Sequence, residues 1–469
     1  MRRVAAFVSL LVVAAVASGS DPVAPGREDL FRSFLAFEEA LAEPSAASLD
    51  RRATNIAVDR ASIGFFAGRY ADTMRTLADE AAAARGLSGA ERDAFTALLM
   101  HRFVAEPREL VIDNARASGA RIAISALPYV KEAALPERLT FVVTRPDGSA
   151  EHIDAAMPAT LDLAASSALQ PGTYRVDVRT SSGLAVPAVR VPVFAEAPAA
   201  TIEALRARLD RIVNADLETD VAATRSRLDL AAGRVTSSAG FLADRPRLLA
   251  EIDAEIRAYE SGRFAWLDRR GEAWRSVPVL GGAAPVRVLI PESLEPGASP
   301  PLVIALHGAG ADESMFLAGY GRGELGRIAR AKGFVVACPV SSSFGLTPRF
   351  FDELVAEMRR TANVDPGRVY LVGHSMGAGA AARVASQRGD RVAGIGLIAG
   401  TGAPKGYPAE RTVVVRAGVD GIVRVPIEAD AVVYPDEGHL LVVPVALPAL
   451  IDRLLAMPPV ASAATRGTE

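Results

Sequence analysis

Residues 369–380 of the chain read VYLVGHSMGAGA. An apolar run, 369–372, passes directly into Gly373-His374-Ser375-Met376-Gly377, and small residues that can open a helix follow. Glycines two positions before and after Ser375 let neighbouring backbone segments approach without Cβ clashes, so the serine can occupy a strained turn with its Oγ exposed. The sequence therefore predicts a strand, a tight turn carrying Ser375 and a helix, in that order.

Apolar runs alternate with helical segments on both sides of this turn. The runs are 302–306, 334–338, 369–372, 395–399, 413–415 and 431–434. Continuous apolar strands that alternate with helices indicate a parallel sheet covered by helices on both faces. We therefore predict an α/β domain with a doubly wound, mostly parallel sheet over residues 275–457, followed by a tail at 458–469.

A glycine-rich segment, His307-Gly308-Ala309-Gly310, follows the first of these runs. A loop after an early strand can present a backbone N–H to an oxygen that develops negative charge, and the residue after the serine can present a second. We predict Ala309 and Met376 as these two main-chain donors. His307 is expected to brace the loop.

The general base can be chosen almost by elimination. The chain has five histidines, and only His439 lies downstream of Ser375. It ends the segment Pro435-Asp436-Glu437-Gly438-His439, which follows the last apolar run. A positioned histidine is the most frequent base for a serine hydroxyl, so we predict His439 in that role.

A carboxylate that orients the histidine should lie between Ser375 and His439, in the order serine, acid, histidine. Asp420 stands three residues after the strand-like run 412–417, in a loop from which a side chain can reach His439. It would hold the imidazole tautomer and stabilise the imidazolium ion. Asp436 is the alternative.

These ordered motifs resemble the α/β-hydrolase superfamily, and within it the secreted esterases of the polyhydroxybutyrate-depolymerase, feruloyl-esterase and dienelactone-hydrolase-like kind. The likeness covers about residues 275–457. It implies that Ser375 attacks an acyl carbonyl and forms an acyl-enzyme, which water activated by the histidine then releases. The substrate would be a small-molecule or polymeric ester, and no cofactor is implied.

One feature departs from the pattern of this superfamily. Only residues 418–430 separate the run that precedes Asp420 from the last run, where relatives usually fit a full helix. A parallel crossover needs about ten to twelve residues, so this link is barely long enough. Because no insertion of helical length lies between the late strands, we expect no large cap domain and an open site that tolerates bulky or polymeric esters.

The first half of the chain has a different organisation. Apolar residues recur at helical spacing over 28–106, give way to short β-rich runs over 107–197, and return to helical spacing over 199–262. We predict two helical regions on either side of a small β-sandwich-like module. The module is expected to pack as a spacer, with binding of carbohydrate or polymer as the alternative.

The N-terminus has the pattern of an export signal. Arg2 and Arg3 precede an apolar stretch, 4–17, which is shorter than the roughly 20 residues that a membrane-spanning helix needs. Small residues at 15–17 place the cleavage after Ala17. We expect a periplasmic or secreted protein without a membrane contact after cleavage, and an uncleaved anchor is the alternative.

Composition excludes several other classes of protein. The 469 residues include 52 basic and 55 acidic side chains, a near balance that excludes a dedicated nucleic-acid surface. Half of the residues are apolar, which is typical of a folded chain. Because Cys338 is the single cysteine, an intramolecular disulfide and a cysteine-built metal site are excluded, and we expect no metal.

The sequence leaves two alternatives to a serine hydrolase of esters. The predicted triad does not distinguish an ester from an amide, so a peptidase or amidase of the same fold stays open. The short link around Asp420 also leaves open a non-catalytic cell-surface binding protein with a degenerate hydrolase domain. The distances from His439 to Asp420 and to Ser375 discriminate between an intact and a broken triad.

Overall fold

The computed structural model describes residues 21–461 apart from 132, 181, 235–236, 267–268, 280–281, 341–347 and 425–429. The predicted signal peptide, residues 1–17, and its cleavage after Ala17 lie outside the described residues, as do the last eight residues of the predicted tail. Within the described part, no helix is long and apolar enough to cross a membrane.

Four helices begin the described chain and pack against one another. They are α1 (Arg27–Leu41), α2 (Arg51–Phe66), α3 (Tyr70–Ala84) and α4 (Gly89–Leu99). Their apolar residues recur every three or four positions, which buries Phe34 and Phe37 of α1 and Leu77 of α3 in one cluster. The carboxylate of Asp50 accepts a hydrogen bond from Ala53 N (3.0 Å) and caps the start of α2.

Eight strands follow and form two sheets. The first contains β1 (His101–Glu106), β3 (Arg121–Pro128) and β6 (Ala159–Asp162). The second has the order β2 (Leu110–Val111), β8 (Ala185–Phe194), β7 (Gly172–Arg179), β4 (Arg138–Thr144) and β5 (Ala150–Ala156), and α5 (Ile112–Ser118) lies between β2 and β3 in the chain. Alternate residues of both sheets are buried in a shared cluster, as expected of sheets with one inward face.

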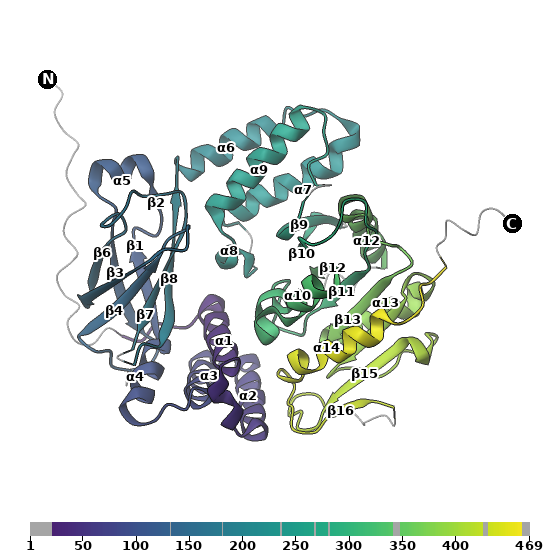
Figure 1. Ribbon diagram of the computed structural model, residues 1–469, viewed down its shortest axis with the longest axis horizontal. Helices are drawn as coiled ribbons and strands as arrows, with labels where there is room; N and C mark the ends of the chain where they lie inside the picture. The colour runs from purple at the N-terminus through teal and green to yellow at the C-terminus, as the bar shows by residue number, and fades with distance from the viewer. Residues whose placement is uncertain are drawn as a thin grey trace.

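A second helical group connects this β module to the rest of the chain. It consists of α6 (Pro198–Leu209), α7 (Glu218–Ala231), α8 (Ala239–Leu242) and α9 (Arg245–Glu260). These helices bury an apolar cluster of their own, which includes Leu209, Leu228 and Ile252. In Figure 1 they lie above α1, α2 and α3, and both of these sets of helices lie between the β module and the C-terminal domain.

The C-terminal domain is built on one eight-stranded sheet with the order β16-β15-β14-β13-β11-β12-β10-β9. Its two antiparallel strands are β9 (Gly271–Val279) and β10 (Gly282–Ile290). Its parallel strands are β11 (Leu302–Leu306), β12 (Val335–Pro339), β13 (Val369–His374), β14 (Gly394–Ile398), β15 (Thr412–Ala417) and β16 (Val432–Tyr434).

Helices cover both faces of this sheet. Side chains of α10 (Tyr320–Lys332) and α14 (Val442–Leu455) pack on one face, and those of α12 (Pro348–Ala362) and α13 (Met376–Arg388) pack on the other. The prediction of a doubly wound, mostly parallel sheet is therefore confirmed. The strand order changes direction beside β11 and β13, and the carboxyl ends of strands at such a point form a crevice in which ligands bind.

A buried ion cluster joins the second helical group to the C-terminal domain. Asp220 of α7 accepts hydrogen bonds from Arg275 of β9 (2.6 Å) and from Arg360 of α12 (2.6 and 2.9 Å). Glu357 of α12 pairs with both arginines, and the Arg275 guanidinium lies 4.3 Å from the ring centroid of the buried Trp266. Because Asp220 and Arg275 are almost fully buried, removing either partner leaves an uncompensated charge.

Replacing Asp220 with alanine should therefore lower the free energy of unfolding by about 3–5 kcal/mol. Urea denaturation of the full chain measures this change. The matched control is Asp210→Ala, which removes an exposed ion pair with Arg225 and should have little effect. Equal stability of the two variants would show that the cluster does not hold these parts together.

A second buried contact joins α1 to α10. Oε2 of Glu38 accepts a hydrogen bond from Gly321 N (3.1 Å), and within the described part of the chain Oε1 has no partner. Burial raises the pKa of Glu38 to about 7, against the pull of the Gly321 N–H and of the cations Arg51 and Arg327. The folded protein therefore favours the neutral, protonated form of the Glu38 carboxyl group.

The stability of the protein should consequently fall as the pH rises from about 4.5 to about 7. In that range the folded protein holds a proton on Glu38 that the unfolded chain has released. Glu38→Gln keeps an acceptor for Gly321 N and should remove this loss, a gain of up to about 3 kcal/mol above neutral pH. Urea denaturation at pH 5 and pH 8 tests this, with Glu39→Gln, an exposed neighbour, as the control. The same pH dependence in both variants would contradict it.

Candidate active site

Ser375 lies on the turn between β13 and α13, as the glycine pattern predicted. Its backbone has φ +53° and ψ −118°, a conformation that non-glycine residues rarely adopt and that often marks a functional site. A Cβ atom added at Gly377 would lie 2.0 Å from Leu306 O, and one added at Gly373 would lie 2.3 Å from Gly377 O. Neither position has room for a side chain, so the two glycines make the turn possible.

His439 and Asp420 meet in a nearly buried pair. The Nδ1–H of His439 donates to Oδ2 of Asp420 at 2.8 Å. The other carboxylate oxygen of Asp420 accepts from the backbone N–H groups of Ile422 (2.8 Å) and Val423 (2.7 Å), which holds the carboxylate in place. The short link after β15 therefore still brings Asp420 to the histidine. The alternative acid, Asp436, is exposed and faces Arg52.

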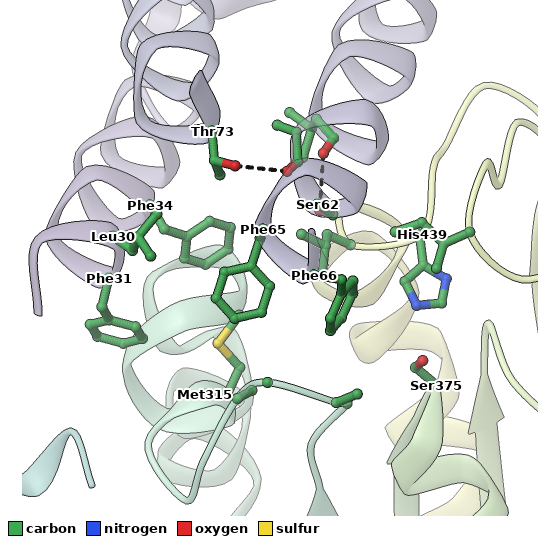
Figure 2. Close-up of a pocket in the computed structure, with 18 of the residues that line it drawn as sticks. Leu30, Phe31, Phe34, Ser62, Phe65, Phe66, Thr73, Met315, Ser375 and His439 are labelled. Carbon is green, nitrogen blue, oxygen red and sulfur yellow. Dashed lines mark hydrogen bonds between the residues drawn. The ribbon is translucent and has the colours of Figure 1, made fainter. Parts of the chain in front are cut away.

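Ser375 faces His439 across one end of a cavity that both residues line. Figure 2 shows the Ser375 side chain and the His439 ring pointing toward one another. No hydrogen bond joins the two side chains in the part of the chain that the structure describes. Such bonds are often long without substrate and shorten when it binds. The structure thus brings all three predicted side chains to one place, with a direct bond between two of them.

The glycine-rich segment after β11 passes directly against Ser375. A Cβ atom added at Gly308 would lie 3.3 Å from Ser375 Cβ, and Ala309 lines the cavity beside the serine. Met376 is the first residue of α13, so its N–H belongs to a helix N-terminus. Nδ1–H of His307 donates to Gly308 O (2.7 Å), and burial lowers the pKa of this histidine. A neutral His307 therefore braces the loop, as expected.

His374, next to the serine, has a supporting position. Its Nε2–H donates to the backbone oxygen of His439 (3.0 Å), and its Nδ1 accepts from the Tyr320 hydroxyl (2.6 Å). Burial, with the nearby His439 adding to it, holds the pKa of His374 well below its ordinary value. A neutral His374 therefore links the backbone of the histidine loop to the end of β13.

Among the described residues, no group of three or more His, Cys, Asp or Glu side chains could hold a metal ion.

Residues 303–466 match the model of a protein family described as the alpha/beta hydrolase family. The C-terminal domain thus combines a match to this family with the doubly wound sheet described above. The chain is also similar to several solved structures. One is a feruloyl esterase module from Clostridium thermocellum, with 12% identity over 40% of this chain and 88% of that chain, at a TM-score of 0.34.

Two further structures have similar values. A thermostable esterase has 20% identity over 42% of this chain and 65% of its own length, at a TM-score of 0.32. A serine hydrolase without a lid from Xanthomonas campestris has 20% identity over 41% of this chain and 99% of its own length, at a TM-score of 0.31. No match is found among curated proteins.

Helix α2, from the front of the chain, holds the histidine loop of the hydrolase domain. Asn55 accepts a hydrogen bond from Gly438 N (2.6 Å) and donates to Asp436 O (3.0 Å). Arg51, one turn earlier, binds both oxygens of the Glu437 carboxylate at 2.7 and 3.0 Å. The loop that carries His439 is therefore fastened to a helix almost 400 residues away in sequence.

Asp59, one turn after Asn55, links the loop that carries Asp420 to the loop that carries His439. Its carboxylate accepts from the backbone N–H groups of Gly421 (2.8 Å) and His439 (3.0 Å) and is 2% exposed. Burial raises the pKa of Asp59, and the nearby Asp420 raises it further, whereas the two N–H groups oppose the shift. Asp59 thus fixes the spacing between the acid loop and the histidine loop.

The sequence analysis missed these residues of α2. The signal that could have found them is their spacing, since Arg51, Asn55 and Asp59 recur every four positions and so share one face of a helix. A polar stripe of this kind usually faces solvent, and nothing in the pattern indicates that it contacts a loop near residue 438.

The site is more covered than the sequence led us to expect. The cavity beside Ser375 has a volume of about 350 Å³, and α1, α2 and α3 provide much of its wall. In Figure 1 these three helices lie beside the end of the sheet that carries β15 and β16. The helices that cover the site come from the front of the chain. The sequence between the late strands therefore gives no sign of them.

Asp59→Ala should lower kcat for the reaction at Ser375 by about 10²-fold, because a shift of about 1 Å in a catalytic group can cost this much. KM should change little, since Asp59 holds the loops and does not line the cavity. Asp59→Asn keeps one acceptor oxygen and should recover part of the loss. Steady-state kinetics with an ester substrate measures all three proteins. Asp72→Ala, an exposed aspartate of α3, is the control, and an unchanged kcat in Asp59→Ala would contradict the positioning role.

Proposed function

We propose that this protein is a secreted serine hydrolase that cleaves carboxylic esters through Ser375, His439 and Asp420. The observation that carries the proposal is the 2.8 Å hydrogen bond from His439 Nδ1 to Asp420, with the ring facing Ser375 in the same cavity. The α/β-hydrolase match over 303–466 supports it. The hydrogen bond also favours an intact triad over the non-catalytic alternative.

The first half of the proposed reaction forms an acyl-enzyme. Because Nδ1 carries the proton that Asp420 accepts, Nε2 of His439 is the atom that takes the proton of Ser375. The serine Oγ attacks the carbonyl carbon, and the carbonyl oxygen becomes an oxyanion that the N–H groups of Ala309 and Met376 stabilise. Losing one such donor typically costs about 10²–10³ in turnover. His439 then protonates the alcohol oxygen as its bond to the acyl carbon breaks.

The second half uses water in place of the alcohol. His439 removes a proton from a water molecule, the hydroxide attacks the acyl-enzyme, and the same two N–H groups stabilise the second oxyanion. The carboxylic acid leaves when Ser375 regains its proton. Asp420 stays ionised throughout and stabilises the imidazolium ion.

An amide substrate is the alternative for the same residues. Amide cleavage needs efficient protonation of a poor leaving group, whereas an activated ester does not. A comparison of p-nitrophenyl esters with matched p-nitroanilides separates the two, and we expect turnover of the esters alone.

The proposed function includes export of the protein from the cytoplasm. The pattern of Arg2, Arg3 and the apolar stretch 4–17 supports translocation, and the mature chain would begin at Ser18. Mass spectrometry of the protein recovered from periplasm and medium identifies the first residue.

Ser375→Ala should reduce ester turnover by around 10⁶-fold, as removal of a triad nucleophile does elsewhere. A fluorophosphonate probe should label the native protein at Ser375 and fail to label the variant. The control is Ser386→Ala, on the same helix α13, whose hydroxyl donates to Ala382 O. Turnover retained in Ser375→Ala, or no labelling of the folded native protein, would refute the proposed function.

A further inference from the structure

The cavity beside Ser375 extends away from the triad between side chains that are mostly apolar. Figure 2 shows Phe66 and Phe65 next to the triad, with Phe34, Leu30 and Phe31 beyond them. All five belong to α1 and α2, and Met315 of the hydrolase domain lies opposite them. The front helices therefore form an aromatic wall for whatever group of the substrate enters.

The polar side chains in this wall already have partners. Arg27 and Asp312, which also line the cavity, form an ion pair with each other (2.8 Å). The hydroxyl of Ser62 donates to Val58 O (3.0 Å), that of Thr73 donates to Ala61 O (3.0 Å), and that of Tyr320 donates to His374. A polar group that enters the cavity would lose its water and find no free hydroxyl donor among these three to replace it. The cavity therefore favours an apolar group.

The position of the cavity indicates that it receives the acyl part of the ester and not the alcohol part. The alcohol oxygen must lie near His439, because it receives its proton there. The cavity extends away from His439 along the loop 308–312, whose Ala309 N–H is proposed to bind the carbonyl oxygen. The substituent on the carbonyl carbon is thus the group directed into the cavity.

The size of the cavity limits that group. At about 30 Å³ for each water-sized group, 350 Å³ holds about a dozen non-hydrogen atoms. A medium-length acyl chain fits, whereas a long fatty acyl chain does not.

Phe65 also contacts the backbone of the oxyanion loop. A Cβ atom added at Gly310, where φ is +76°, would lie 2.5 Å from Phe65 Cε1. The next residue, Phe66, is 56% exposed although it lines the cavity, so a bound acyl chain would cover an aromatic ring that is otherwise exposed to water. The front helices thus contact this loop, and they would also contact an acyl chain bound in the cavity.

We propose that this cavity is an acyl-binding site for medium-length apolar acyl groups, and that α1 and α2 of the front region determine the preferred length. The proposal rests on the proposed function, since it assigns the substrate class of the same site. It places the choice of substrate in residues 27–66, outside the matched hydrolase segment.

The first experiment measures kcat/KM of the full chain with p-nitrophenyl esters from acetyl to palmitoyl. Each added methylene should raise kcat/KM by about fourfold until the cavity is full, near octanoyl or decanoyl, and palmitoyl should be poor. A parallel series of acetate esters with longer alcohols should be nearly flat. A flat acyl series, or a length dependence in the alcohol series alone, would overturn the proposal.

The second experiment changes the wall. Phe66→Ala should lower the ratio of octanoyl to acetyl kcat/KM by about tenfold, and its exposed position makes a folding defect a minor concern. Phe34→Ala should lengthen the preferred acyl group, because it removes a side chain from the end of the cavity that lies away from Ser375. The matched control is Ile63→Ala, an exposed apolar residue of α2 outside the cavity, and its ratio should equal that of the native protein. Equal ratios in all four proteins would overturn the role of the front helices.

A binding measurement separates this proposal from the proposed function. Octanoate should bind to the Ser375→Ala protein in isothermal titration calorimetry, and Phe66→Ala in the same background should weaken it about tenfold. Binding without turnover or fluorophosphonate labelling in the native protein would refute the hydrolase and keep the acyl site. Labelling and turnover without octanoate binding and without acyl selectivity would refute the acyl site and keep the proposed hydrolase.

Discussion

The structure depends on a close approach of backbone at the end of β13. Because Gly377 lies against Leu306 O and Gly373 lies against Gly377 O, the chain can turn from strand to helix within a few residues and expose Ser375. The same approach brings the segment after β11 beside the serine, so Ser375 and Ala309 lie close together. The turn also lies where the strand order of the sheet changes direction, at the crevice where ligands bind in such sheets.

The loops that carry Asp420 and His439 depend on α2 for their placement. The loops after β15 and β16 are short, and the backbone N–H groups of Gly421, Gly438 and His439 need acceptors where the chain covers them. Asn55 and Asp59 supply these acceptors from a helix at the front of the chain. Without α2 these three N–H groups would lose their acceptors, so the placement of the two loops depends on a helix from the front of the chain.

The same helices give the site its enclosure. Buried contacts at Glu38 and Asp220 hold the two front helical groups to the hydrolase domain, and a continuous apolar cluster runs from α1 and α3 to α10 and α14. Phe65 and Phe66 are thereby held over the loop at Gly310. The proposed catalytic residues and the proposed choice of substrate come from different parts of the chain, which only their packing brings together.

The sequence by itself determined the strand, turn and helix around Ser375, the mostly parallel sheet, and the choice of His439 and Asp420 as partners. These features follow from local patterns, since glycine spacing, apolar runs and the order of residues act within one element or between neighbouring strands. Only the tertiary structure decided that α1, α2 and α3 cover the site and that Arg51, Asn55 and Asp59 hold its loops. Such contacts join residues more than 360 positions apart, and the surface that a helical face meets is set by the packing of the whole chain and not by its own periodicity.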